Sequence, residues 1–131
     1  MESIPFSSAT EDYMSDINGM IRMENNALVI EYQTLSISDY FSGKKSDLND
    51  VSIPLEEVAE ISLKKNFFQS IVMLRTHKMK STQKLPQPNN GEVKFYIKKK
   101  YRDNALQLIA EVNLRLSEIR LKSLDNNPDE Y

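Results

Sequence analysis

The sequence contains no cysteine, only three glycines and a single histidine. Without cysteine the chain has no disulfide bond, no thiolate zinc site and no thiol catalysis, which suits a reducing cytoplasm. The glycines at 19, 43 and 91 are too far apart to form a glycine-rich phosphate loop. His77 has neither a cysteine nor an acidic cluster nearby, so we expect it at the surface or at a strand end, and we expect no metal site and no general base there.

Long apolar runs are missing as well. The first residues lack the basic and apolar segments of an export signal, and no window approaches the ~20 apolar residues of a membrane span. We therefore expect a cytoplasmic protein with no integral membrane segment. The formal net charge is only -2, which provides no overall attraction to nucleic acid or to an anionic membrane. Any anion site must be local.

What is present is the composition of one soluble globular domain. The chain has 131 residues, of which 40% are hydrophobic and 27% charged, and a chain of this size buries roughly two thirds of its unfolded surface. We predict an irregular N-terminal arm over residues 1–16, anchored by Ile4 and Phe6, a folded domain over 17–122, and a disordered acidic tail over 123–131.

Short strands are predicted for most of the folded domain. After a break at Asn18 and Gly19, residues 20–23 and 27–32 form a hairpin whose asparagine turn tolerates positive φ. The apolar alternation then slips by one residue, which predicts a bulge near Gln33 and Thr34. A strand at 51–53, a helical turn at 54–57, a second hairpin over 58–76 and an alternating strand at 93–98 follow, the last with Val93, Phe95 and Ile97 facing inward.

The segment from about 101 to 122 is the one long predicted helix. It has no glycine or proline and is rich in strong helix formers. Its first apolar stripe, which we expect to cover the sheet, has the spacing of a single helical face and comprises residues 105, 108, 109, 112, 116 and 119. The expected class is thus α+β, mainly antiparallel β: about seven strands and one C-terminal helix.

Meandering strands closed by a terminal helix resemble the pleckstrin-homology-like (PH-like) superfold, a bent two-sheet barrel capped by one C-terminal helix. The resemblance is carried by GMIRM at 19–23, LVIEY at 28–32, IPLEEVAEI at 53–61, RDNA at 102–105 and LRLSE at 114–118. These phrases are similar to those of a group of small bacterial PH-like proteins without an assigned activity. The resemblance implies the fold but no particular function, because this superfold hosts lipid, peptide and protein recognition alike.

The sequence departs from the phosphoinositide-binding members of the superfold. Those members have several Lys and Arg around the loop that joins their first two strands. In the predicted strand order that loop is residues 24–26, which include no basic residue. The resemblance therefore does not imply inositol phosphate binding.

The tip of the second hairpin is the first candidate interaction site. It places Phe67 and Phe68 beside Lys64 and Lys65, and exposed apolar tips rimmed by lysine are used to contact membrane surfaces or partner proteins. The alternative is that one or both phenylalanines fold back over the end of the barrel, where each would belong to the core.

The later strands also form a locally basic stretch. Lys94, Tyr96 and Lys98 share the outward face of the strand at 93–98, which is ordinarily a solvated face but is also suited to an anion. Because the aromatic and glycine signature of an RNA-binding sheet is absent, we expect no nucleic acid partner.

The helix has a second apolar set about 140° from the first stripe. It includes Leu106, Leu114 and Leu121, together with residues 110 and 124. One interpretation is an unusually wide core face wrapped by the N-terminal arm. The other is an interface, either for self-association or for another protein. With no catalytic constellation, cofactor motif or metal motif in the sequence, we expect a non-enzymatic module that mediates protein contacts, and as the alternative a peripheral membrane or anionic-lipid binder.

Overall fold

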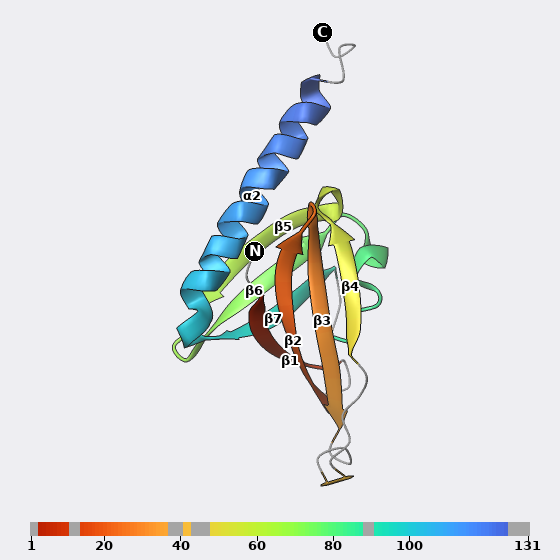
Figure 1. Cartoon of the computed structure of the whole chain (residues 1–131), viewed down its shortest axis with the longest axis vertical. Coiled ribbons are helices and arrows are strands. Elements are labelled where there is room, and N and C mark those ends of the chain that lie inside the picture. Colours follow the sequence, from red (N-terminus) through yellow and green to blue (C-terminus); the bar gives the residue numbers. More distant parts are fainter. Residues whose placement is uncertain (1–2, 11–13, 37–40, 43–47, 88–90, 126–131) are drawn as a thin grey trace.

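The computed structural model describes residues 3–10, 14–36, 41–42, 48–87 and 91–125. In these ranges the fold is α+β, as predicted, with seven strands followed by one long helix (Figure 1). The strands are β1 (Ile4–Ala9), β2 (Ser15–Glu24), β3 (Ala27–Ser36), β4 (Asn49–Pro54), β5 (Val58–Lys65), β6 (Gln69–Thr76) and β7 (Glu92–Lys98). Short 3-10 turns η1 (Leu55–Glu57), η2 (Met79–Thr82) and η3 (Lys99–Tyr101) connect them, and α2 (Arg102–Asp125) ends the described chain.

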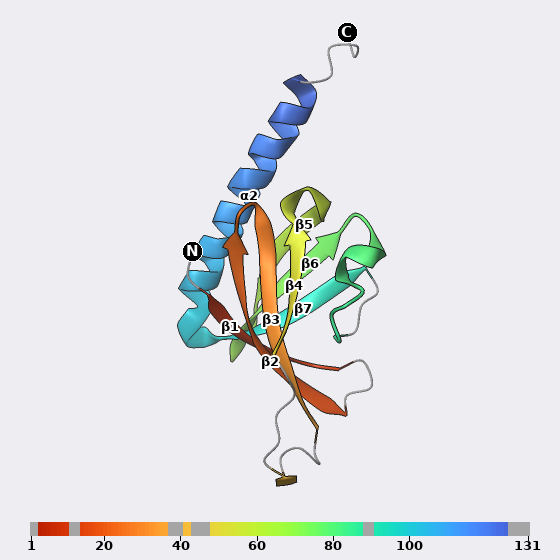
Figure 2. The same ribbon diagram turned by 45° about the vertical axis from the view of Figure 1, so that its right-hand side comes forward.

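All seven strands belong to one antiparallel sheet with the order β4-β3-β2-β1-β7-β6-β5. The sheet bends so strongly that β2, β3 and β4 lie across β5, β6 and β7 (Figure 2). This arrangement is consistent with a PH-like fold, although the sheet is continuous rather than divided in two. It is also not closed, since the edge strands β4 and β5 do not pair along their described lengths.

The prediction of an irregular N-terminal arm is wrong for residues 4–9, which form β1 between β2 and β7. Ile4 and Phe6 are buried in the core, and they face Ile21 and Gly19 of β2 in the strand register. The sequence did not predict this strand for two reasons. Pro5 lies inside it, and its second half consists of two serines and an alanine, so the apolar alternation covers only two positions.

Two expectations about β2 and β3 are also wrong. Asn18 and Gly19 lie inside β2 rather than at a break, and β3 pairs with β2 in unbroken register past Gln33 and Thr34 without the predicted bulge. Residues 31–36 are all half-buried, so no core face constrains their alternation. The register shift lies in β5, between Val58 and Glu60.

Most of the other local predictions are confirmed. Asn25 and Asn26 have φ values of 50° and 59°, as the tight β2–β3 turn requires. The turn expected at 54–57 is η1, and Val93, Phe95 and Ile97 of β7 point into the core. The helix extends three residues beyond its predicted end, because residues 123–125 belong to α2, and residues 126–131 of the predicted tail lie outside the described ranges.

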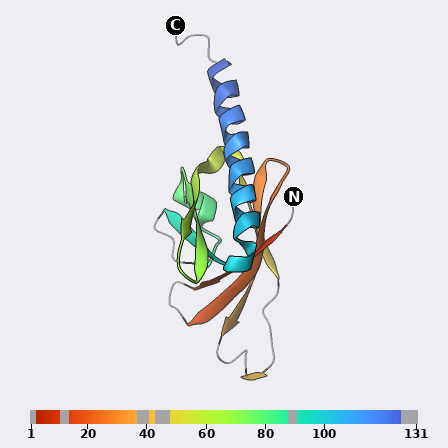
Figure 3. The ribbon, with the colours of Figure 1, turned by 90° about the vertical axis from the view of Figure 1, so that its left-hand side faces the viewer.

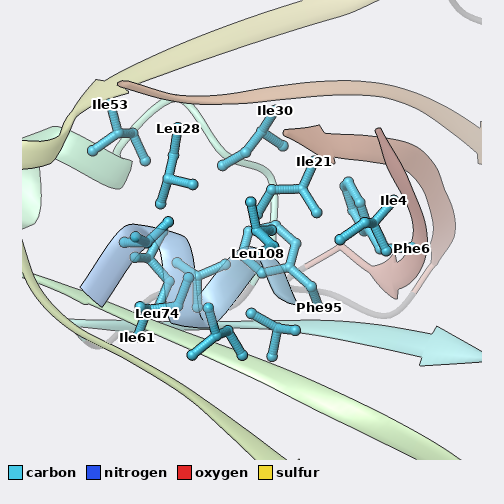
Figure 4. Packing of buried hydrophobic residues seen from close by; sticks show 14 of the residues in the cluster. Ile4, Phe6, Ile21, Leu28, Ile30, Ile53, Ile61, Leu74, Phe95 and Leu108 are labelled. Atoms are coloured by element: carbon cyan, nitrogen blue, oxygen red, sulfur yellow. The ribbon is translucent and has the colours of Figure 1, made fainter. Parts of the chain in front are cut away.

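The core fills the space between the two halves of the sheet and α2 (Figure 4). Ala105, Leu108, Ile109, Val112 and Leu116 of α2 are buried, and Ile119 packs at the margin. Figure 3 shows the N-terminal half of α2 lying against the body of the sheet, while its C-terminal half projects past it. The predicted role of the first apolar stripe is therefore confirmed.

Candidate interaction surfaces

The β5–β6 hairpin ends in a tight turn at residues 66–69. The Asn66 N–H donates a hydrogen bond to the Gln69 carbonyl at 2.9 Å, and the Phe67 N–H donates to Asn66 Oδ1 at 2.6 Å. The asparagine therefore organises the turn with both its backbone and its side chain. Since the strand register ends with Lys65 opposite Ser70, the two phenylalanines are carried just past the last paired residues.

Both phenylalanines of the turn are exposed to solvent. Their exposed fractions are 84% for Phe67 and 82% for Phe68, and their rings touch edge to face with centroids 5.1 Å apart. The interpretation that one or both fold back over the barrel end is wrong. The two rings lie in the turn of residues 66–69, beyond the last strand pair of Lys65 and Ser70, at the outer end of the hairpin.

The start of α2 is attached to this hairpin. Arg102 Nε donates to Ser70 Oγ at 2.7 Å, and Arg102 Nη2 donates to the Asn66 carbonyl at 3.4 Å. Ser70 is buried and Arg102 is half-buried, so the first of these bonds is partly shielded from water. Figures 1 and 2 both show the hairpin tip beside the first turn of α2. The tip is thus held by two elements rather than one.

Six cationic residues gather at this end of the molecule. We call them the basic collar: Lys64, Lys65, Lys98, Lys99, Lys100 and Arg102. The lysines are exposed, and Gln69 pairs with Lys98 across β6 and β7, which brings η3 next to the turn. Asp103 is the only acidic residue within 64–70 and 98–103. A chain with a net charge of -2 therefore presents one strongly positive end that also contains two adjacent exposed phenylalanines, Phe67 and Phe68.

Sequence reasoning found the hairpin tip but did not join it to Lys98, Lys99, Lys100 and Arg102. These residues are brought to the hairpin tip by the antiparallel register of β6 and β7, which places the end of β7 beside the start of β6. Lys94 of the predicted basic face is exposed and Tyr96 is half-buried, further along β7. Lys78, Lys80 and Lys84 follow the other end of β6, so the basic residues of the middle chain do not form one surface.

The outer face of α2 is the second candidate surface. Leu106, Leu114 and Leu121 are 40%, 59% and 61% exposed, and Leu124 is similar. The interpretation that an N-terminal arm covers them is wrong, since that segment is β1 inside the sheet. Arg120 Nη2 donates to the Ala59 carbonyl at the edge of β5 at 3.4 Å, and the helix beyond it projects from the body (Figure 3).

The corrected strand order also moves the loop between the first two strands. It is the segment 10–14, with the sequence TEDYM, which contains two acidic residues and no basic one. Ala9, the last residue of β1, lies beyond the Ser7–Tyr96 pair, toward the start of β7. The basic collar is therefore at the opposite end of β7 from the end of β1.

Within the described ranges no three His, Cys, Asp or Glu side chains lie close enough to hold a metal ion. His77 is exposed, as predicted, and its backbone N–H donates to the Glu57 backbone carbonyl at 2.9 Å. None of the helices in the described ranges combines the length and the apolar character needed to cross a membrane. Comparison of the chain with protein-family models, with curated proteins and with solved structures finds no match.

Proposed function

We propose that this chain is a non-enzymatic binding module on a PH-like scaffold that attaches peripherally to anionic membrane surfaces. The observation that supports this proposal is the exposed Phe67 and Phe68 pair inside the basic collar. Exposed aromatic rings rimmed by long cationic side chains suit the boundary between headgroups and acyl chains.

Two weak forces combine at such a tip. Burying one phenylalanine side chain is worth about 1.5–3 kcal/mol, and each Lys or Arg near an anionic leaflet adds about 1 kcal/mol. Neither force alone provides stable attachment, which generally requires two signals. The tip has both, because the rings of Phe67 and Phe68 project from a turn whose flanking strands and helix carry the collar.

The tip is also ordered before it meets a surface. The turn is closed by its own hydrogen bonds, and Arg102 ties it to α2 through Ser70 and Asn66. Little conformational freedom is left to lose on contact, and such preorganisation favours binding. The proposal therefore requires no folding step at the membrane.

Vesicle co-sedimentation tests the proposal with a pair of charge-matched variants. Lys64→Gln/Lys65→Gln should weaken binding to phosphatidylserine-containing vesicles about 30-fold, at about 1 kcal/mol per charge. Lys78→Gln/Lys80→Gln removes the same charge from exposed positions beyond the other end of β6, and it should change binding less than about 3-fold because it lies away from the contact. Equal losses in the two variants, or no vesicle binding by the wild type, would contradict the proposal.

The contribution of Phe67 and Phe68 to vesicle binding can be measured separately. Phe67→Ala/Phe68→Ala should weaken vesicle binding at least about 10-fold, because the apolar area of the two rings is no longer buried in the bilayer. The sequence has no tryptophan, so Phe67→Trp provides a single fluorophore at the tip. Its emission should be red in buffer and shift to the blue with anionic vesicles; an unchanged spectrum would count against insertion.

The exposed leucines of α2 favour a second function, contact with another protein chain. Leu114 and Leu121 lie on a side of the helix that the sheet does not cover. Protein contact through this face is compatible with membrane attachment, since the tip is at the start of the helix and these leucines are in its later turns.

A further inference from the structure

Four exposed apolar residues of α2 and one serine follow a regular spacing. Ala110, Leu114, Ser117, Leu121 and Leu124 are all exposed and are separated by alternating steps of four and three residues. We call this set the outer seam. Steps of four and three mark the a and d positions of a two-stranded coiled coil. The buried residues of α2 lie on the other side of the helix, so the seam and the core do not compete for the same face.

We infer that the outer seam docks a second copy of this chain, with the two α2 helices side by side and parallel. The seam lies on the side of α2 that faces away from the sheet, and Figures 1 and 3 show the C-terminal part of the helix standing clear of the domain body. Two copies can therefore bring these turns together without either sheet intervening.

The residues that flank the seam favour the parallel orientation of two copies over the antiparallel one. Glu111 and Glu118 occupy the positions next to the seam on one side, and Asn113 and Arg120 occupy those on the other. In a parallel pair Asn113 lies near Glu118 of the second copy. This contact is acceptable, because the asparagine amide can donate a hydrogen bond to the glutamate carboxylate. In an antiparallel pair the glutamate sides face each other, and Glu118 opposes its own equivalent. Like charges in that position are unfavourable.

The seam is short, so the expected dimer is weak. Residues 110–124 make about four helical turns, which bury less than the roughly 800 Å² per partner of a standard interface. An isolated helix of this length would be marginal in water. Here the helix is already formed, because residues 105–116 anchor it to the core. We therefore expect a Kd of about 10 to 100 µM in solution.

A parallel pair has a consequence that rests on the proposed membrane function. Arg102 attaches the start of α2 to the hairpin tip, so parallel helices bring both tips to the same end of the dimer. An antiparallel pair would separate them by the length of the helices. When one tip of such a dimer is bound to a membrane, the second tip is held near the same surface at a high effective concentration. The dimer can therefore bind the membrane more tightly than a single tip by about 100-fold or more.

Cysteine cross-linking tests the orientation, since the native sequence has no cysteine and an introduced one reports only its own position. With Leu124→Cys, mild oxidation at about 100 µM protein should cross-link two copies at least about tenfold faster than with Ser123→Cys, the neighbouring exposed control on another face of the helix. If a mixture of Leu114→Cys and Leu124→Cys proteins forms the mixed disulfide faster than Leu124→Cys forms its own, the pairing is antiparallel and the inference is overturned.

Sedimentation velocity provides the second measurement. The wild type should shift from monomer toward dimer as concentration rises through the expected Kd, and Leu114→Glu/Leu121→Glu should remain monomeric with an unchanged circular dichroism spectrum. A wild type that stays monomeric at several hundred µM, above the expected range, overturns the inference. The two proposals fail separately, because the seam variant should still bind vesicles through single tips and Phe67→Ala/Phe68→Ala should still dimerise.

Discussion

At the scale of single residues, Gly19 determines how closely β2 approaches its two neighbours, β1 and β3. A Cβ atom at this position would lie 2.0 Å from the Glu31 carbonyl oxygen and 2.9 Å from two ring carbons of Phe6. The Phe6 ring is in turn fixed by its edge-to-face contact with Phe95, with ring centroids 4.8 Å apart. The glycine is needed for space and not for an unusual backbone angle.

Gly19→Ala should therefore lower the free energy of unfolding by about 1–3 kcal/mol, the usual cost of overpacking a core. Chemical denaturation monitored by circular dichroism measures this change. Asn18→Ala, at the adjacent exposed position of β2, is the control and should stay within about 0.5 kcal/mol of the wild type. Equal stability of Gly19→Ala and the wild type would mean that β2 moves away from Phe6 at no cost.

At the scale of elements, α2 has two apolar faces with different roles. One face holds the sheet, and its side chains are buried from Ala105 to Leu116. The other face is exposed along nearly the whole length and contributes nothing to the core of one copy. A helix that only covered a sheet would need a single apolar face.

A pair of leucine substitutions separates these roles. Leu108 is fully buried and Leu114 is 59% exposed, so Leu108→Ala should cost about 2–5 kcal/mol of unfolding free energy. Leu114→Ala should stay within about 0.5 kcal/mol. Denaturation at low micromolar protein concentration, where the expected dimer is dissociated, provides the comparison. Similar losses in the two variants would show that Leu114 packs within its own chain.

At the scale of the whole molecule, charge is separated along the body. The net charge of -2 conceals a positive end, because the collar brings six cations together and Asp103 is the only acidic residue of the segments 64–70 and 98–103. The rest of the chain has a formal net charge of -8, which is -2 minus 6. An anionic surface would therefore attract the collar and repel the rest of the molecule, which orients the chain before contact.

This separation predicts a two-part salt dependence of vesicle binding. Between about 0.1 M and about 1 M salt the Debye length falls from about 10 Å to about 3 Å, so the contribution of the collar should disappear and only weak attachment through Phe67 and Phe68 should persist. Phe67→Ala/Phe68→Ala should lose this salt-resistant remainder. Co-sedimentation across a salt series measures both parts, and binding that does not change with salt would exclude a role for the collar.

The candidate site was only partly predictable. The turn-forming Asn66 and the sequence neighbours of Phe67 and Phe68 indicated a hairpin tip, and the spacing of Leu106, Leu114 and Leu121 indicated a second face on the helix. The exposure of these side chains and the approach of Lys98, Lys99 and Lys100 to the tip could not be derived, since they depend on the register of β6 and β7 and on the docking of Arg102.

The amino-acid sequence by itself determined the elements whose side chains repeat with a clear period: the buried stripe of α2, the alternation of β7 and the asparagine turn between β2 and β3. Only the tertiary structure decided that residues 4–9 form a central strand and that one end gathers the collar around two exposed rings. The physical reason is that local periodicity reports which face of an element is apolar, whereas strand order and exposure depend on pairing between residues far apart in the chain.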